Sequence, residues 1–117
     1  MKQALVLAVM LAAPAVLAAD YKCNGDRVEK SGSTQYTVRT SGSDITIEKG
    51  GSTKGKAVRR GSKYAVEVGG STVATFENGK IEKGGSSWAT VSDAQREYDC
   101  PGDVAATLWV LAKSGKL

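Results

Sequence analysis

One short phrase recurs four times and constrains the fold more than any other feature of this chain. Each copy joins a β-branched residue and a glutamate to Gly-Gly or Ser-Gly. The copies are "VEKSGST" (28–34), "IEKGGST" (47–53), "VEVGGST" (66–72) and "IEKGGSS" (81–87). Glycine pairs suit two-residue hairpin turns, because the central residues of those turns take positive φ, where a Cβ atom would clash. The phrase therefore predicts a hairpin turn at each copy.

Strand-forming residues flank every copy. Ile45 precedes the second copy, which begins with Ile47, for example, and Val73 and Phe76 follow the third. This pattern predicts four hairpins, or about eight short strands. The expected strands cover roughly 26–30, 33–39, 43–49, 52–59, 63–68, 71–77, 79–83 and 86–91. Consecutive antiparallel strands form a meander. We therefore expect a mainly β fold, an antiparallel meander that makes a curled sheet or a small barrel rather than a solenoid.

Two registers can be drawn for the second hairpin. A two-residue turn at Gly50-Gly51 would place Ile47 opposite Lys54, which mixes core with solvent. A longer loop that includes Ser52 would instead place Glu48 opposite Lys54, a favourable cross-strand ion pair. We therefore expect the longer loop.

The C-terminal stretch changes period. In "CPGDVAATLWVLAKSGKL" (100–117), apolar residues recur at helical spacing, from Val104 through Leu108 to Leu111. Asp103 is the expected N-cap, so the pattern predicts a C-terminal α-helix over about 103–114. A helix this apolar must be covered. We expect it to pack across the sheet or to plug one end of a barrel.

The N-terminal stretch predicts a cleaved signal peptide over residues 1–18. A short positive start precedes "ALVLAVMLAAPAVLA" (4–18), and small residues precede the expected cut after Ala18. Fifteen apolar residues are shorter than the roughly twenty that span a bilayer. The expected product is a periplasmic or secreted chain, a single β domain over residues 19–117 that carries the C-terminal helix.

The chain has two cysteines, Cys23 and Cys100. An even count in an exported chain predicts a disulfide. Closing the long loop from residue 23 to residue 100 would stabilise the fold by about 4 kcal/mol. A metal site on two thiolates is a poor alternative, because the chain has no histidine to complete it.

The absence of histidine also removes the usual nucleophile–base pairs of hydrolases. Glu29, Glu48, Glu67 and Glu82 recur at one position of the phrase, which predicts solvated side chains rather than an acid–base pair. We therefore expect no enzyme and no cofactor. Without Lys2, the chain carries 15 Lys+Arg against 12 Asp+Glu, a net charge of +3 that does not argue for nucleic acid.

The most polarised stretch is "KGKAVRRGSK" (54–63). It holds five cations in ten residues, namely Lys54, Lys56, Arg59, Arg60 and Lys63. Such a cluster could dock against an acidic cleft or phosphate. Basic residues on edge strands can equally protect a sheet from aggregation. The sequence leaves both interpretations open.

Two short stretches, "YKCNG" (21–25) and "RRGSKYAV" (59–66), resemble segments of the periplasmic inhibitors of c-type lysozyme. In that family, a Ser-Gly-x-x-Tyr type loop enters the active cleft of lysozyme and meets its acidic residues. The resemblance maps Ser62 and Tyr64 onto that loop, with Lys63 or Arg60 nearby. Periplasmic immunity proteins that neutralise delivered toxins are similar in the same broad sense.

These observations together predict an exported binding protein that acts by occlusion, as an inhibitor or immunity protein. Its expected partner is a toxin or cell-wall hydrolase with an acidic cleft, and no membrane span is expected after signal cleavage. The expected partner-binding residues are Lys54, Lys56, Arg59, Arg60, Ser62, Lys63 and Tyr64. The alternative is a structural or glycan-associated envelope protein without a dedicated enzyme target.

Overall fold

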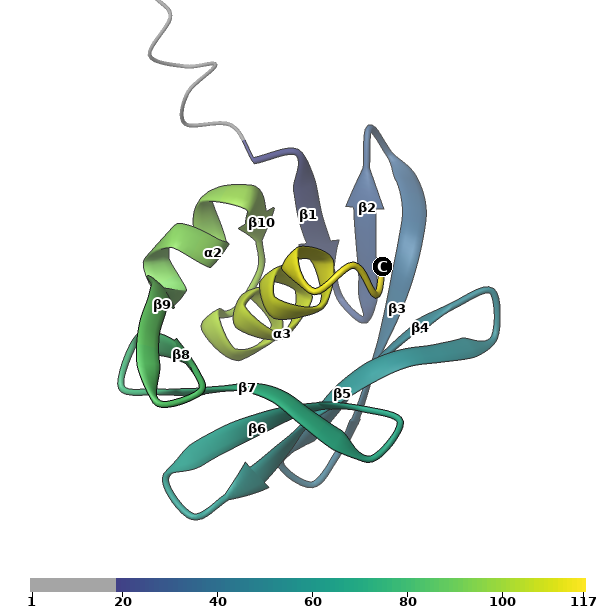
Figure 1. Ribbon diagram of the computed structural model, residues 1–117. Coiled ribbons are helices and arrows are strands. Elements are labelled where there is room, and N and C mark those ends of the chain that lie inside the picture. Colours follow the sequence, from purple (N-terminus) through teal and green to yellow (C-terminus); the bar gives the residue numbers. More distant parts are fainter. Residues whose placement is uncertain (1–18) are drawn as a thin grey trace, which may run out of the picture.

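The computed structural model describes residues 19–117, so the predicted signal peptide lies outside the described residues (Figure 1). Ten strands form one sheet in the order β10-β1-β2-β3-β4-β5-β6-β7-β8-β9. The strands are β1 (Tyr21–Asn24), β2 (Arg27–Lys30), β3 (Ser33–Ser41), β4 (Asp44–Lys49), β5 (Ser52–Arg60), β6 (Lys63–Val68), β7 (Ser71–Glu77), β8 (Lys80–Lys83), β9 (Ser86–Thr90) and β10 (Tyr98–Asp99). The predicted mainly β meander is confirmed. The sheet curls without closing, because β9 and β10 are its two edges.

Two strands were not expected. Strand β1 contains Cys23, and β10 pairs with it in parallel through Tyr21 opposite Tyr98. The predicted disulfide joins Cys23 to Cys100 at a sequence separation of 77. A two-residue strand has too little pattern to be recognised in a sequence. Its place in the sheet depends on contacts between the two ends of the domain.

Two-residue turns link the strands from β1 to β9. Turns 31–32, 50–51, 69–70 and 84–85 all lie at one end of the sheet, here called the repeat rim. Both central residues there have positive φ, such as Gly50 at 59° and Gly51 at 83°, which is the type I′ pattern. Turns 25–26, 42–43, 61–62 and 78–79 form the opposite end, here called the variable rim. Three of these four have positive φ at the first central residue only, the type II′ pattern.

Every repeat-rim hairpin also contains a β-bulge. In the second copy Glu48 pairs with Thr53 and Ile47 pairs with Gly55, so Lys54 is the extra residue. The longer loop expected at Gly50-Gly51 is therefore wrong, and Glu48 does not face Lys54. The bulge keeps Ile47 away from Lys54, so a two-residue turn and an apolar inner face are compatible. Bulges increase local twist and bend strands, which accounts for the curl of the sheet.

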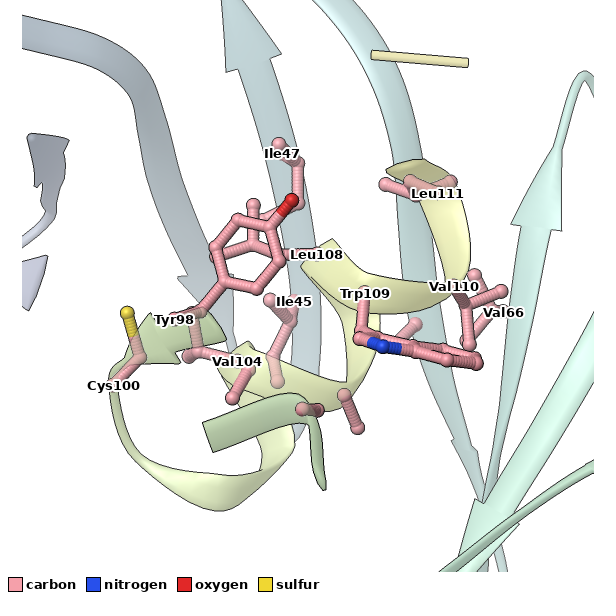
Figure 2. Packing of buried hydrophobic residues seen from close by; sticks show 14 of the residues in the cluster. Ile45, Ile47, Val66, Tyr98, Cys100, Val104, Leu108, Trp109, Val110 and Leu111 are labelled. Carbon is pink, nitrogen blue, oxygen red and sulfur yellow. The ribbon is translucent and has the colours of Figure 1, made fainter. Parts of the chain in front are cut away.

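Helix α3 (Gly102–Lys113) lies inside the curl, and its residues 104–111 are all buried (Figure 1). Figure 2 shows Ile45, Ile47 and Val66 of the sheet gathered around the side chains of this helix. The expected helix is confirmed within one residue at each end. The expected cap is wrong, because Pro101 is the N-cap and makes no side-chain hydrogen bond. Asp103 instead accepts a hydrogen bond from the Val104 N–H at 2.8 Å.

The helix comes closest to the sheet at Gly55. A Cβ atom there would lie 2.5 Å from Leu111 Cδ2, and Leu111 is fully buried. The corresponding positions of the other three hairpins hold Tyr36, Ala74 and Ala89. The side chains on the inner face of the sheet are thus smallest at Gly55, where α3 packs closest to the sheet. Close packing requires this.

Helix α2 (Val91–Glu97) leads from one edge of the sheet to the other, because the chain runs from β9 through α2 into β10 (Figure 1). Thr90 and Asp93 form a capping box that starts this helix. Glu97 accepts a hydrogen bond from Trp109 Nε1 at 3.1 Å, which joins α2 to α3. Among the described residues, no helix has the length and apolarity needed to cross a membrane.

Candidate partner-binding site

Strand alternation divides the predicted basic cluster between two faces of the β5–β6 hairpin. Ala57 pairs with Val66, and both belong to the core. Arg59 and Tyr64, two positions along each strand, form the next pair on this inner face. Arg60 and Lys63 pair beside the turn and therefore point to the outer face.

The hairpin tip, residues 59–63, is exposed throughout and internally braced. Arg59 Nε donates to the Gly61 carbonyl at 2.8 Å, and its guanidinium carbon lies 5.3 Å from the Tyr64 ring centroid. Tyr64 stacks in turn on Phe76 at 4.9 Å between centroids. These contacts fix the inner side of the tip. Binding a partner would therefore cost the tip little further conformational entropy.

On the outer face, Arg60 is committed to Glu67. Arg60 Nη2 lies 2.7 Å from Glu67 Oε2, and the Glu67 side chain is only 10% exposed. The register places Glu67 opposite Lys56 and Arg60 opposite Lys63, so this ion pair runs along the hairpin rather than directly across it. Arg60 thus compensates a nearly buried carboxylate and is less available to a partner than its 62% exposure suggests.

Glu77, at the end of the neighbouring strand β7, contacts the turn at residues 61–62 and the lysine that follows it. Ser62 Oγ donates to Glu77 Oε2 at 2.8 Å, and Lys63 Nζ lies 4.0 Å from Glu77 Oε1. This carboxylate fixes the position of the Ser62 hydroxyl. It also makes the tip less basic than the sequence alone indicated.

A cleft of about 310 Å³ separates the tip from the N-terminal end of α3. Arg59, Ser62 and Tyr64 line it on the hairpin side, and Asp103 lines it on the helix side. A second cleft of about 460 Å³, which also includes Asp103, continues past Asp26 and beside the disulfide. The structure therefore brings three of the seven predicted residues into one cleft that presents charge of both signs.

Lys54 and Lys56 lie elsewhere. They line a groove of about 390 Å³ with Thr46 and Glu67 that extends toward the turn at 69–70. Lys54 occupies the bulge, whereas Lys56 is exposed on the outer face. The seven predicted residues thus do not form one surface. We define the tip site as Arg59, Ser62, Lys63 and Tyr64, with Arg60 beside it.

A second group of cations was missed in the sequence. Lys30, Lys49 and Lys83 stand directly before the turns of three repeat-rim hairpins. Their ammonium groups lie 5.3 Å, 5.5 Å and 4.9 Å from the ring centroids of Tyr21, Tyr36 and Trp88, in that order. The signal was present in the sequence, because three of the four phrases place Lys directly after Glu.

The repeat rim also holds a buried tyrosine, Tyr98, whose surroundings shift its pKa. Tyr98 stacks on Tyr21 at 4.9 Å between centroids. Burial raises the pKa of the Tyr98 hydroxyl well above its ordinary value, and the neighbouring Tyr21 adds to the effect. Burial raises the pKa of Tyr36 in the same direction. Tyr98 and Tyr36 therefore stay protonated as packing groups of the core.

No family model, curated protein or solved structure matches this chain. Function is therefore inferred from the chain's own residues.

Proposed function

We propose that this protein is an exported periplasmic binding protein that acts by occlusion, as an inhibitor or immunity protein. In this proposal the tip site enters an acidic cleft of its partner, a toxin or a cell-wall hydrolase, and blocks it. The mature chain neither catalyses a reaction nor needs a cofactor. The observation that carries the proposal is the exposed, internally braced tip at residues 59–63.

Bracing matters because ordering a flexible loop on binding costs affinity. The contacts of Arg59 with Gly61 and Tyr64 already order the inner side of the tip. The Ser62–Glu77 hydrogen bond orders the turn. A tight hairpin of this kind can enter a cleft as a rigid body, while Arg59 and Lys63 supply positive charge for the partner's carboxylates.

The first experiment is a search for the partner. Mature protein, residues 19–117, is immobilised and used to capture proteins from a periplasmic extract, and a c-type lysozyme is tested directly in a cell-wall lysis assay. We expect one stoichiometric protein whose activity falls on binding. Recovery of cell-wall material in place of a protein would instead support the alternative, a structural or glycan-associated envelope protein.

The second experiment assigns the surface. Arg59→Ala/Lys63→Ala should weaken partner binding by about tenfold to a hundredfold, the range of one or two contributing side chains at an interface. Arg60→Ala alone is a poor probe, because it would leave the nearly buried Glu67 without its cation. It is therefore combined with Glu67→Gln.

The matched control is Lys30→Ala/Lys83→Ala, which removes the same charge from the repeat rim. It should leave partner binding within about twofold of the parent protein, since exposed charges beyond a Debye length are screened. Equal losses in the tip and control variants would show that net charge alone drives binding, and would refute the assignment of the tip site.

A further inference from the structure

We propose that the repeat rim is a second binding surface, at which Lys30, Lys49 and Lys83 contact the anionic headgroups of a lipid membrane. The protein would lie on the bilayer by this rim without crossing it. This proposal is independent of the proposed function, because it uses other residues at the other end of the sheet.

Alternation separates the charges of the repeated phrase. Ile47 is a core residue, so Glu48 points to the outer face and Lys49 to the inner face at the rim. The same order holds for Glu29 with Lys30 and for Glu82 with Lys83. The phrase therefore places its cations on the inner lip of the curled sheet and its carboxylates on the outside.

The three lysines are exposed and, within residues 19–117, lie farther than 4.0 Å from every carboxylate. Glu48, the nearest carboxylate in sequence to Lys49, is paired with Arg39 at 2.8 Å on the outer face. The tip differs in this respect, because Glu67 and Glu77 already engage Arg60 and Lys63. The rim lysines are thus more available to an external anion.

Helix α3 adds positive charge at the same end. Leu111, in its last turn, packs at Gly55, close to the second repeat-rim turn. Lys113 and Lys116 follow Leu111 and are exposed. Lys113 is partly neutralised by Glu97 at 3.7 Å, so Lys116 contributes the clearer charge.

The chemistry of the rim favours a lipid surface. Two of the three rings beside the rim lysines, those of Tyr21 and Trp88, are partly exposed, whereas the ring of Tyr36 is buried. Partly exposed Tyr and Trp rings beside lysines are typical of membrane–water interfaces, where the rings sit at headgroup level and the ammonium groups reach the phosphates. The turns add little bulk. The turn glycines Gly50, Gly51, Gly84 and Gly85 have open space where a Cβ would be, which allows a close approach to a flat surface.

The test is co-sedimentation of mature protein with vesicles. Vesicles of phosphatidylcholine with phosphatidylglycerol should bind the protein, and vesicles of phosphatidylcholine alone should not. Each lysine near an anionic surface contributes about fivefold to the partition coefficient, so Lys30→Gln/Lys49→Gln/Lys83→Gln should reduce binding by about a hundredfold. Raising the salt concentration should weaken binding of the parent protein.

The third copy offers a test by gain. It holds Val68 where the other copies hold lysine. Val68→Lys should therefore increase binding to the anionic vesicles by about fivefold. Thermal denaturation of every variant identifies any that binds poorly because it is unfolded.

The charge-matched control is Arg59→Gln/Lys63→Gln/Lys80→Gln, which removes three cations at the variable rim. It should bind anionic vesicles within about threefold of the parent, a smaller change than one rim lysine would cause. Three results would each overturn the proposal: equal binding to neutral vesicles, equal losses in the two triple variants, or capture by an acidic polysaccharide with no binding to vesicles. None of these results bears on the partner of the tip site.

Discussion

The two rims of the sheet are built from equally short turns, yet they differ in almost every other respect. The repeat rim uses one phrase four times, adds a bulge to each hairpin and positions lysines over aromatic rings. The variable rim has no bulges among its four hairpins, and its turns differ in sequence. It carries the braced tip and the clefts around Asp103.

Under the proposed function, this difference separates architecture from recognition. Repetition at one rim sets the turns and the twist, so the sheet curls around α3. The other rim is then free to vary, and its individual residues can be fitted to one partner. The repeat rim is uniform instead, which suits a uniform surface such as a bilayer.

The largest expected effect comes from removing the covalent tie that keeps both rims in one domain. Cys23→Ser/Cys100→Ser should lower the free energy of unfolding by about 4 kcal/mol, because the unfolded chain gains the entropy of a long open loop. Urea denaturation of the oxidised parent and of the variant measures the difference. A loss below about 1 kcal/mol would mean that the β1–β10 pairing holds the ends without the disulfide.

The rims should also differ in their tolerance of alanine. Gly50→Ala/Gly51→Ala places a Cβ atom at two positions of positive φ and should cost about 2–4 kcal/mol. Gly42→Ala/Ser43→Ala changes the corresponding pair at the variable rim, where only Gly42 has positive φ, and should cost about 1–2 kcal/mol. Thermal or urea denaturation compares them. Equal costs would contradict the assignment of different turn types to the two rims.

Just inside the repeat rim, Gly55→Ala should cost about 1–3 kcal/mol, because its methyl group would overlap Leu111. Leu111→Ala opens space at the same point and should cost about 2–5 kcal/mol. Because the new methyl group can occupy that space, the double variant should lose less than the sum of the two single losses. Additive losses would show that Gly55 and Leu111 do not press against each other.

The smallest effect should appear only in alkali. Because burial raises the pKa of Tyr98 in the folded state, the unfolded chain loses this proton first as the pH increases. The stability associated with the neutral phenol is fully present below about pH 10, the ordinary pKa of tyrosine, and decreases above it. Melting temperatures of the parent should therefore fall from about pH 10 to pH 12, and those of Tyr98→Phe should fall less. Parallel curves would indicate that other groups cause the alkaline loss.

Local rules in the sequence predicted most of the architecture. Glycine pairs marked the turns, helical spacing marked α3, and an even cysteine count indicated the disulfide. The bulges were not predicted, because the extra residue at Lys54 looks like any other strand residue until α3 fixes which face is apolar. Strand β10 and the Pro101 cap likewise depend on contacts between distant parts of the chain.

The candidate site was less predictable than the fold. The sequence presents the cluster at 54–63 as one basic patch, but alternation separates Arg59 from Arg60 once the register is known. The roles of Glu67 and Glu77 come from neighbouring strands, so they could not be foreseen from the charge run. The rim lysines could have been found, because they recur with the phrase.

The register of the second hairpin tests the account most directly, since it determines which charges point inward and which outward. Cross-strand NOEs in residues 19–117 should join Lys49 to Ser52 and, on the far side of the bulge, Ile45 to Ala57. Contacts of Ile45 with Lys56 instead would mean a hairpin without a bulge. Lys54 and Lys56 would then face α3, and the division of the tip residues between the two faces of the hairpin would be contradicted.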